Sequence, residues 1–245
     1  MRKLLFLALI GFSLASCNKT GDFDLSFHAT WDSNPLVLNE SQSYGDLNLK
    51  FENLTFYLSD VSLTNDDGET IELSDVEFVE LNSFTETDAI NGQTFSFTDL
   101  PAGKYTKFSF SIGVPPDLNA TTPEDYNVSD VLGKTDYYWG PWASYIFSKI
   151  EGNADTDGNG EFDLKFFYHT GSNALFRSFE INRDIIIDDK NPTNLELYID
   201  YDVLLRDENE DYFNISEFPK NHKPEDLDAL TALVDNYVKA IKFRD

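Results

Sequence analysis

Hydrophobic and polar residues alternate along most of this chain. In the stretch FDLSFHATW, Phe23, Leu25, Phe27, Ala29 and Trp31 share one face, and polar residues occupy the other. A period of two predicts a β-strand that buries one side.

Further strand-like segments follow at short intervals. They cover residues 47–63, 71–81, 95–100, 105–114, 145–152, 160–171, 174–188 and 195–205. The first of these reads as two strands with a bulge at Asn53. Between residues 63 and 71, Asp67 and Gly68 supply the positive φ of a tight hairpin turn.

The pattern changes near the end of the chain, where apolar residues recur at helical spacing. They are Leu227, Leu230, Leu233, Val234, Tyr237, Val238 and Ile241. This spacing predicts an amphipathic helix. Together, the segments predict an all-β fold, an antiparallel β-sandwich closed by a C-terminal helix.

One long polar stretch, from residue 115 to about residue 136, interrupts the strands and contains three prolines and a glycine. A loop of this length in a compact domain is usually functional, for example as a lid.

The N-terminus has the features of an exported lipoprotein. Two cations precede an apolar run that is too short to span a membrane, and the stretch LASC ends at Cys17, the only cysteine. We therefore expect a lipoprotein signal peptide at 1–16, a lipidated tether at 17–22 with the lipid on Cys17, and one domain at 23–245. An ordinary signal peptide followed by an incidental cysteine is the alternative.

This N-terminus predicts an extracytoplasmic protein anchored to the outer membrane, at its periplasmic face or at the cell surface. A formal net charge of −26 repels nucleic acid and attracts cations, so no nucleic-acid partner is expected. Solubility explains most of these carboxylates equally well.

The three histidines differ in their surroundings. His28 and His169 each fall inside a predicted strand, where burial is costly without a partner or a metal. Taken singly, each is more often a hydrogen-bonded structural residue. His222 lies in the polar loop FPKNHKPED, where a solvated side chain is expected.

An acidic stretch, DTDGNGEFD, has the alternating spacing of a calcium-binding loop. The candidate ligands are Asp155, Asp157, Asn159, Glu161 and Asp163. Phe166 stands where such a loop carries its bidentate glutamate, and no helix precedes it. A plain β-hairpin turn is therefore the alternative to a weak calcium site.

Several segments occur in an order that resembles the MbnP family of copper-binding proteins. They are LSFHATWDSNPLVLN, FYLSDVSL, LPAGKYTKFSFSIGV, YYWGPWASYIFSKIEG and FFYHTG. The resemblance extends from about residue 23 to about residue 243. It implies a β-sandwich that holds one copper ion and belongs to bacterial copper handling.

The resemblance also implies a ligand set. In the family, histidines bind copper together with a tryptophan that a partner enzyme oxidises to kynurenine. That enzyme is a di-haem protein similar to cytochrome c peroxidases. The matching residues here are His28, His169 and Trp139. An unmodified tryptophan has only an N–H donor and cannot ligate a metal.

The aromatic segment departs from the family pattern Met-Tyr-Trp-x-Trp-x-Ser-Gly-Tyr. Tyr137 replaces the methionine, Pro141 stands at the second tryptophan position, and Trp142 follows one residue later. Both Trp139 and Trp142 therefore remain candidates for the modified residue.

Two functions follow from these observations. The first is a lipid-anchored copper-binding protein in acquisition, storage or delivery. The second is a surface adhesion module, in which an aromatic platform binds a glycan or a protein. Its residues would be Tyr137, Tyr138, Trp139 and Trp142. No nucleophile, metalloprotease or phosphate-loop motif supports an enzyme.

Overall fold

The computed structural model describes residues 19–207, 209–223 and 226–244. The strands are β1 (Thr20–Trp31), β2 (Asn34–Pro35), β3 (Gln42–Tyr44), β4 (Leu47–Asn65), β5 (Thr70–Glu80), β6 (Gln93–Pro101), β7 (Gly103–Ile112), β8 (Tyr138–Trp139), β9 (Ser144–Asp155), β10 (Leu164–Gly171), β11 (Arg177–Ile187), β12 (Thr193–Asp200), β13 (Lys220–Asn221) and β14 (Ile241–Arg244). The α-helices are α1 (Glu86–Asn91), α2 (Pro116–Asn119), α3 (Tyr201–Leu204) and α4 (Leu227–Ala240). The predicted signal peptide and Cys17 lie outside the described residues.

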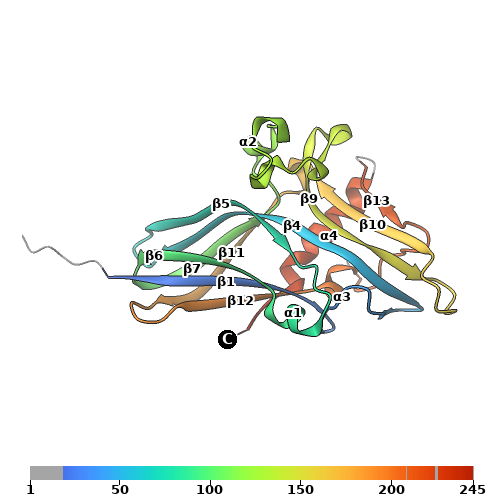
Figure 1. Ribbon diagram of the computed structural model, residues 1–245, viewed down its shortest axis with the longest axis horizontal. Helices are drawn as coiled ribbons and strands as arrows, with labels where there is room; N and C mark the ends of the chain where they lie inside the picture. Colours follow the sequence, from blue (N-terminus) through green and yellow to red (C-terminus); the bar gives the residue numbers. More distant parts are fainter. Residues whose placement is uncertain (1–18, 208, 224–225, 245) are drawn as a thin grey trace, which may run out of the picture.

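The strands form two sheets that face each other (Figure 1). One follows the order β14-β12-β1-β2, with β6 also paired to β1. The other follows the order β11-β7-β4-β9-β10-β13, with β3 and β5 on β4 and with β8 on β9. The predicted β-sandwich is confirmed.

The central pairing of the smaller sheet is parallel, which differs from the predicted antiparallel fold. β1 and β12 lie side by side in register from Phe23 opposite Thr193 to Thr30 opposite Asp200. Parallel neighbours need a crossover connection, and here most of the chain runs between the two strands. No hydrophobic pattern distinguishes this pairing from an antiparallel one.

The predicted apolar face of β1 forms part of the core. Phe23, Leu25, Phe27, Ala29 and Trp31 are all buried. The Phe27 ring meets rings of the opposite sheet edge-on, at centroid distances of 5.6 Å to Phe56 and 6.5 Å to Phe110. Burying an aromatic side chain of this size contributes about 1.5–3 kcal/mol.

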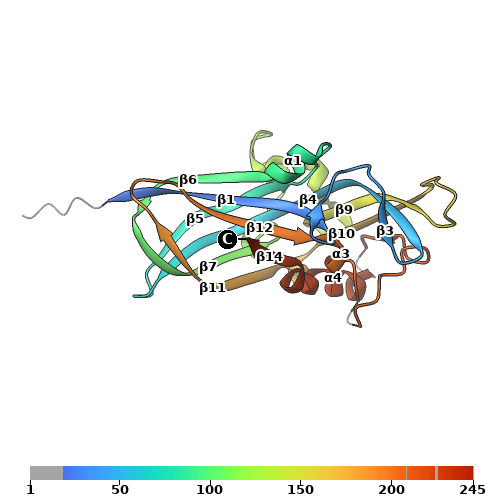
Figure 2. The same cartoon turned by 90° about the horizontal axis from the view of Figure 1, so that it is seen from below.

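The predicted C-terminal helix is α4, which lies beside the edges of both sheets (Figure 2). Its buried side includes Leu230, Leu233, Val234 and Tyr237, and it contacts β10 and β11 of one sheet and β12 and β14 of the other. Among the described residues, no helix has the length and apolarity needed to cross a membrane.

The long polar stretch is folded against the outer face of the larger sheet, and α2 and short 3₁₀ turns give it structure. Beneath it lies a second apolar cluster that includes Tyr57, Val114 and Tyr145. The Tyr145 hydroxyl donates to the carbonyl of Leu132 (2.9 Å), and the amide oxygen of Asn119 accepts from the Tyr145 N–H (2.8 Å). These bonds hold the stretch as a fixed cover on the sheet.

Local details of the strands agree in part with the predictions made from the sequence. Asp67 and Gly68 form the turn between β4 and β5, with φ of 81° at Gly68. Residues 47–63 belong to one strand, and the pairing of β4 with β9 shifts between Phe51 and Asn53, where the bulge was expected. β1 begins at Thr20, three residues before the predicted start of the domain.

Candidate functional site

The candidate site lies on the outer face of the larger sheet, where β9 and β10 run antiparallel. Phe166 and Tyr168 face the core. Phe167 and His169 therefore face outward, because successive side chains alternate along a strand. Glu151 of β9 pairs with Phe167, which makes it a diagonal neighbour of His169.

Glu151 and His169 form a short hydrogen-bonded pair. The His169 Nε2 atom lies 2.6 Å from the Glu151 Oε1 atom, and both side chains are mostly buried. A carboxylate on one ring nitrogen fixes the proton there and leaves the other nitrogen as a lone-pair donor. Glu151 therefore presents Nδ1 of His169 as the free donor.

A chain of two asparagines supports this carboxylate, one directly and the other through the first. The Asn53 side-chain amide donates to the Glu151 Oε2 atom (3.1 Å), and Asn82 donates to the Asn53 side-chain oxygen (3.2 Å). Asn82 in turn accepts from the backbone N–H of Leu54 (2.8 Å). The hydrogen bond from His169 is the main reason that the pKa of Glu151 falls to about 2, although burial opposes the shift.

His222 completes the site, and the sequence did not reveal it. β13 pairs in parallel with β10 beside Phe167 and Tyr168, which places His222 at the same sheet edge. The His222 ring stands 4.8 Å from the Phe167 ring and 6.3 Å from the His169 ring, between centroids. A two-residue strand leaves no periodic pattern, so His222 looked like a solvated loop residue.

The Nδ1 atom of His222 is buried and has no hydrogen-bond partner among the described residues. Burial lowers the pKa of His222 and nearby His169 lowers it further, whereas Asp226 acts in the opposite direction. Asp226 also accepts the backbone N–H groups of His222 and Lys223, both at 2.9 Å. A neutral imidazole with an unused buried nitrogen is suited to ligate a metal.

Trp139 covers His222. β8 places Trp139 opposite Ser144 of β9, and its ring stacks on His222 with a centroid distance of 4.9 Å and an interplanar angle of 28°. Trp142 lies 5.8 Å from Trp139. It also packs against Gly171, where an added Cβ would come within 2.7 Å of the indole. We refer to Trp139, Glu151, Phe167, His169 and His222 as the imidazole–indole cluster.

The two tyrosines before Trp139 pack against the protein. Tyr137 meets the Phe78 ring edge-on at 4.7 Å, and the Lys149 ammonium lies 4.0 Å from the centre of the Tyr137 ring. Tyr138 meets Tyr145 edge-on at 5.4 Å. Both tyrosines are half-buried, as are Trp139 and Trp142. This segment is therefore not a freely exposed aromatic platform.

His28 lies on the other side of the molecule. Its neighbours Phe27 and Ala29 face the core, so His28 faces the outer side of the smaller sheet, stacked on Tyr198 at 4.4 Å. His169 faces the outer side of the opposite sheet. The structure thus does not bring these two histidines together, and it places His222 beside His169 instead.

His28 is almost completely buried, with 3% of its surface exposed. Neither of its ring nitrogens has a hydrogen-bond partner among the described residues. Burial lowers the pKa of His28, and the Glu196 carboxylate together with the nearby backbone of Ala89 and Ile90 only partly offsets that effect. These features fit a neutral imidazole packed beneath α1.

The acidic stretch forms the hairpin loop between β9 and β10. Asp155 is buried, and its carboxylate accepts the backbone N–H groups of Gly158 (2.8 Å) and Gly160 (2.9 Å). Asp157 accepts from Asn159. Across the described part of the chain, no three His, Cys, Asp or Glu side chains gather in an arrangement for a metal. Asp155 and Asp157 therefore stabilise the turn, and the acidic residues of this loop do not converge as calcium ligands.

Comparison with known proteins agrees with this architecture. The chain matches the MbnP family over residues 20–223. Among solved structures it is similar to MbnP from Methylosinus trichosporium, with 15% sequence identity and a TM-score of 0.53, over 76% of this chain and 78% of that chain. A comparison with curated protein sequences gives no match. Because the family match covers most of the sequence, the chain belongs to the MbnP family.

Proposed function

We propose that this protein is an extracytoplasmic, lipid-anchored copper-binding protein that uses His169 and His222 as ligands. The observation that carries the proposal is the pair of imidazoles beside Trp139. Membership of the MbnP family supports copper, and the stretch ending at Cys17 supports export and lipidation.

The nitrogen donors of the cluster fit copper. Glu151 leaves Nδ1 of His169 as a lone-pair donor, and Nδ1 of His222 is buried without a partner. Two ring nitrogens that share one metal at about 2 Å each place their ring centres about 6.4 Å apart at most, when the two bonds are in line. The observed separation of 6.3 Å is therefore close to that limit. Imidazole donors suit copper among the available transition metals.

Among the described residues no third His, Cys, Asp or Glu side chain joins the two imidazoles in a metal-binding arrangement, so a third donor would have to be of another kind. Trp139 stacks on His222 and is the nearest aromatic candidate. Oxidation to kynurenine by a di-haem partner enzyme, with a peroxide as the oxidant, would cleave the C2–C3 bond of the indole and release C2 as formate. It would convert this non-ligand into an aryl amine and a carbonyl. We propose Trp139 as the modified residue, because its ring stacks on His222, whereas the ring contact of Trp142 is with Trp139.

Copper titration of single-histidine variants tests the assignment. We expect His169→Ala and His222→Ala each to lower the copper affinity by at least about tenfold, because each removes one ligand. The measurement is the dissociation constant for Cu(I) and Cu(II) from a competition assay with a chelator of known affinity.

His28→Ala is the matched control, because His28 is buried on the opposite sheet. It should leave copper affinity unchanged, provided that circular dichroism shows a folded protein. Loss of affinity in His28→Ala, together with full affinity in His222→Ala, would overturn the ligand assignment. Mass spectrometry of protein from the native host should show a mass gain on the peptide that contains Trp139.

A further inference from the structure

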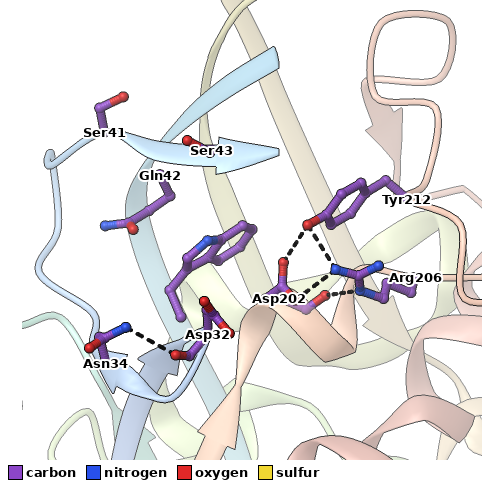
Figure 3. A pocket seen from close by; sticks show the side chains of 9 residues that line it. Asp32, Asn34, Ser41, Gln42, Ser43, Asp202, Arg206 and Tyr212 are labelled. Carbon is purple, nitrogen blue, oxygen red and sulfur yellow. Dashed lines mark hydrogen bonds and ion pairs between the residues drawn. The ribbon is translucent and has the colours of Figure 1, made fainter. Parts of the chain in front are cut away.

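A second concave site lies away from the imidazole–indole cluster and shares no residue with it. It is a pocket of about 480 Å³ at the end of β1 (Figure 3). One wall carries Asp32, Asn34 and Gln42, and the facing wall carries Arg206 and its partners. Its volume falls within the usual range of about 300–1,000 Å³ for small-molecule sites.

The hydrogen-bond donors on one wall are already used. The Arg206 guanidinium donates to the backbone and carboxylate oxygens of Asp202 (3.1 and 2.8 Å), to the Glu210 carbonyl (2.9 Å) and to the Tyr212 hydroxyl (2.8 Å). The Tyr212 hydroxyl donates to the second Asp202 oxygen (2.6 Å). Arg206 therefore has little capacity left to bind an anion.

The charged acceptor on the other wall is free. The Asn34 side-chain amide donates to the backbone carbonyl of Asp32 (3.0 Å). The Asp32 carboxylate makes no hydrogen bond or ion pair with any described residue. The dashed line that reaches Asp32 in Figure 3 is the bond from Asn34 to its backbone carbonyl. Two carboxylates, of Asp32 and Asp202, face one guanidinium, so the pocket carries one excess negative charge.

The position of Asp32 is fixed by its backbone. Asp32 and Ser33 have positive φ values of 47° and 65°. Their N–H groups donate to the two carboxylate oxygens of Asp200, at 3.1 and 3.2 Å. The turn thus holds a free carboxylate beside the Trp31 side chain, which also lines the pocket.

We propose that this pocket binds an organic cation with a guanidinium or alkylammonium head group, and that Asp32 is its charged contact. A ligand for this pocket should supply positive charge and a hydrogen-bond donor to Asp32, because the one free charged group is a carboxylate and the excess charge is negative. Guanidinium and ammonium groups meet both requirements. The site is independent of the proposed copper function.

The test uses N-butylguanidinium and its neutral isostere N-butylurea. Isothermal titration of the full-length mature protein should show saturable one-to-one binding of N-butylguanidinium and no binding of N-butylurea. In ¹H–¹⁵N spectra, the backbone signals of Asp32 and Ser33 should shift. A short peptide with one arginine between glycines separates the possible sources: tighter binding of the peptide indicates an arginine side chain, and tighter binding of N-butylguanidinium indicates a free small cation.

Asp32→Asn should raise the dissociation constant by about tenfold or more. Asparagine tolerates positive φ, so this variant is expected to fold. Asp67→Asn is the control, because it removes the same charge from an exposed turn. Equal weakening in both variants would mean diffuse attraction to an acidic protein and would overturn the proposal. Equal binding of N-butylurea would overturn it as well.

Discussion

Glu151 determines which ring nitrogen of His169 carries the proton and which is left as a lone-pair donor. Its carboxylate holds Nε2 at 2.6 Å, and Asn53 holds the carboxylate. Partners of this kind around a ligating histidine typically change metal affinity by about 10- to 100-fold. Replacing the carboxylate by an amide keeps the shape but weakens the preference for one tautomer.

Glu151→Gln should therefore lower copper affinity by about tenfold or more while the fold is retained. The readout that is independent of copper is the ¹⁵N chemical shift of the His169 ring nitrogens in metal-free protein. In wild type we expect the proton on Nε2, and in the variant a mixture of tautomers. Unchanged ring shifts in the variant would contradict this role.

The same pair makes metal-free stability depend on pH. The pKa of Glu151 falls from its ordinary 4.5 to about 2, so its ionised form is favoured in the folded state. This contribution is present above about pH 4.5 and is lost as the pH falls toward 2. We expect wild type to lose about 1–2 kcal/mol of unfolding free energy relative to Glu151→Gln over that interval.

Urea unfolding at a series of pH values, with a chelator present, measures this difference. The gap between wild type and Glu151→Gln should shrink as the solution becomes more acidic. A gap that stays constant from pH 6 to the acid limit of folding would contradict the prediction.

The three histidines show what a sequence can reveal about single residues. Strand periodicity predicts that His28 and His169 lie in strands, and both do. Periodicity does not indicate which sheet a strand joins. It therefore could not predict that the side chains of His28 and His169 lie on opposite outer faces of the sandwich. His222 depends on a two-residue parallel pairing with β10, which has no local signal.

At the level of elements, α1 covers His28 through a tight contact. The helix ends at Gly92, which has a φ of 62° and whose N–H donates to the Asp88 carbonyl (2.9 Å). An added Cβ at Gly92 would lie 2.6 Å from Nδ1 of His28 and would also press on the carbonyl of Phe27. Because Phe27 and His28 belong to the paired strand β1, their displacement would be needed to relieve this clash.

Gly92→Ala should therefore destabilise the protein by about 2–4 kcal/mol, from backbone strain and from the clash with β1. Gly68→Ala is the matched control, since Gly68 has a φ of 81° but nothing within 4 Å of an added Cβ. The control should lose only about 1 kcal/mol. Chemical denaturation of both variants measures the difference, and equal losses would contradict the contact.

Elements with a strong local pattern were predictable. Alternation predicted β1 and β7, the Asp67–Gly68 pair predicted its hairpin, and helical spacing predicted α4. The calcium-like spacing between β9 and β10 proved ambiguous, because acidic and glycine residues serve a hairpin turn equally well. Backbone N–H groups occupy the Asp155 oxygens there.

The whole molecule carries a large excess of negative charge. The chain has 44 acidic and 18 basic residues, so most carboxylates cannot pair with a cation. Repulsion among them opposes the compact state. Salt shortens the range of this repulsion to about 10 Å at 0.1 M ionic strength.

Raising NaCl from about 10 mM to about 300 mM should raise the melting temperature by several degrees, because screening relieves the repulsion. Calorimetry in metal-free buffer measures the shift. KCl and LiCl should act like NaCl, since screening depends on ionic strength alone. A decrease in melting temperature, or a rise with one cation only, would contradict this explanation.

The parallel pairing of β1 with β12 also sets an order of events during synthesis. β1 is the first strand to appear, yet the residue that accepts the Thr30 hydroxyl, Ile199, lies 169 positions later. At about 5–20 residues per second, the first strand waits roughly 10–30 s for this neighbour. During that delay the edge of β1 that later pairs with β12 remains open, and an open strand edge can pair with a strand of another chain.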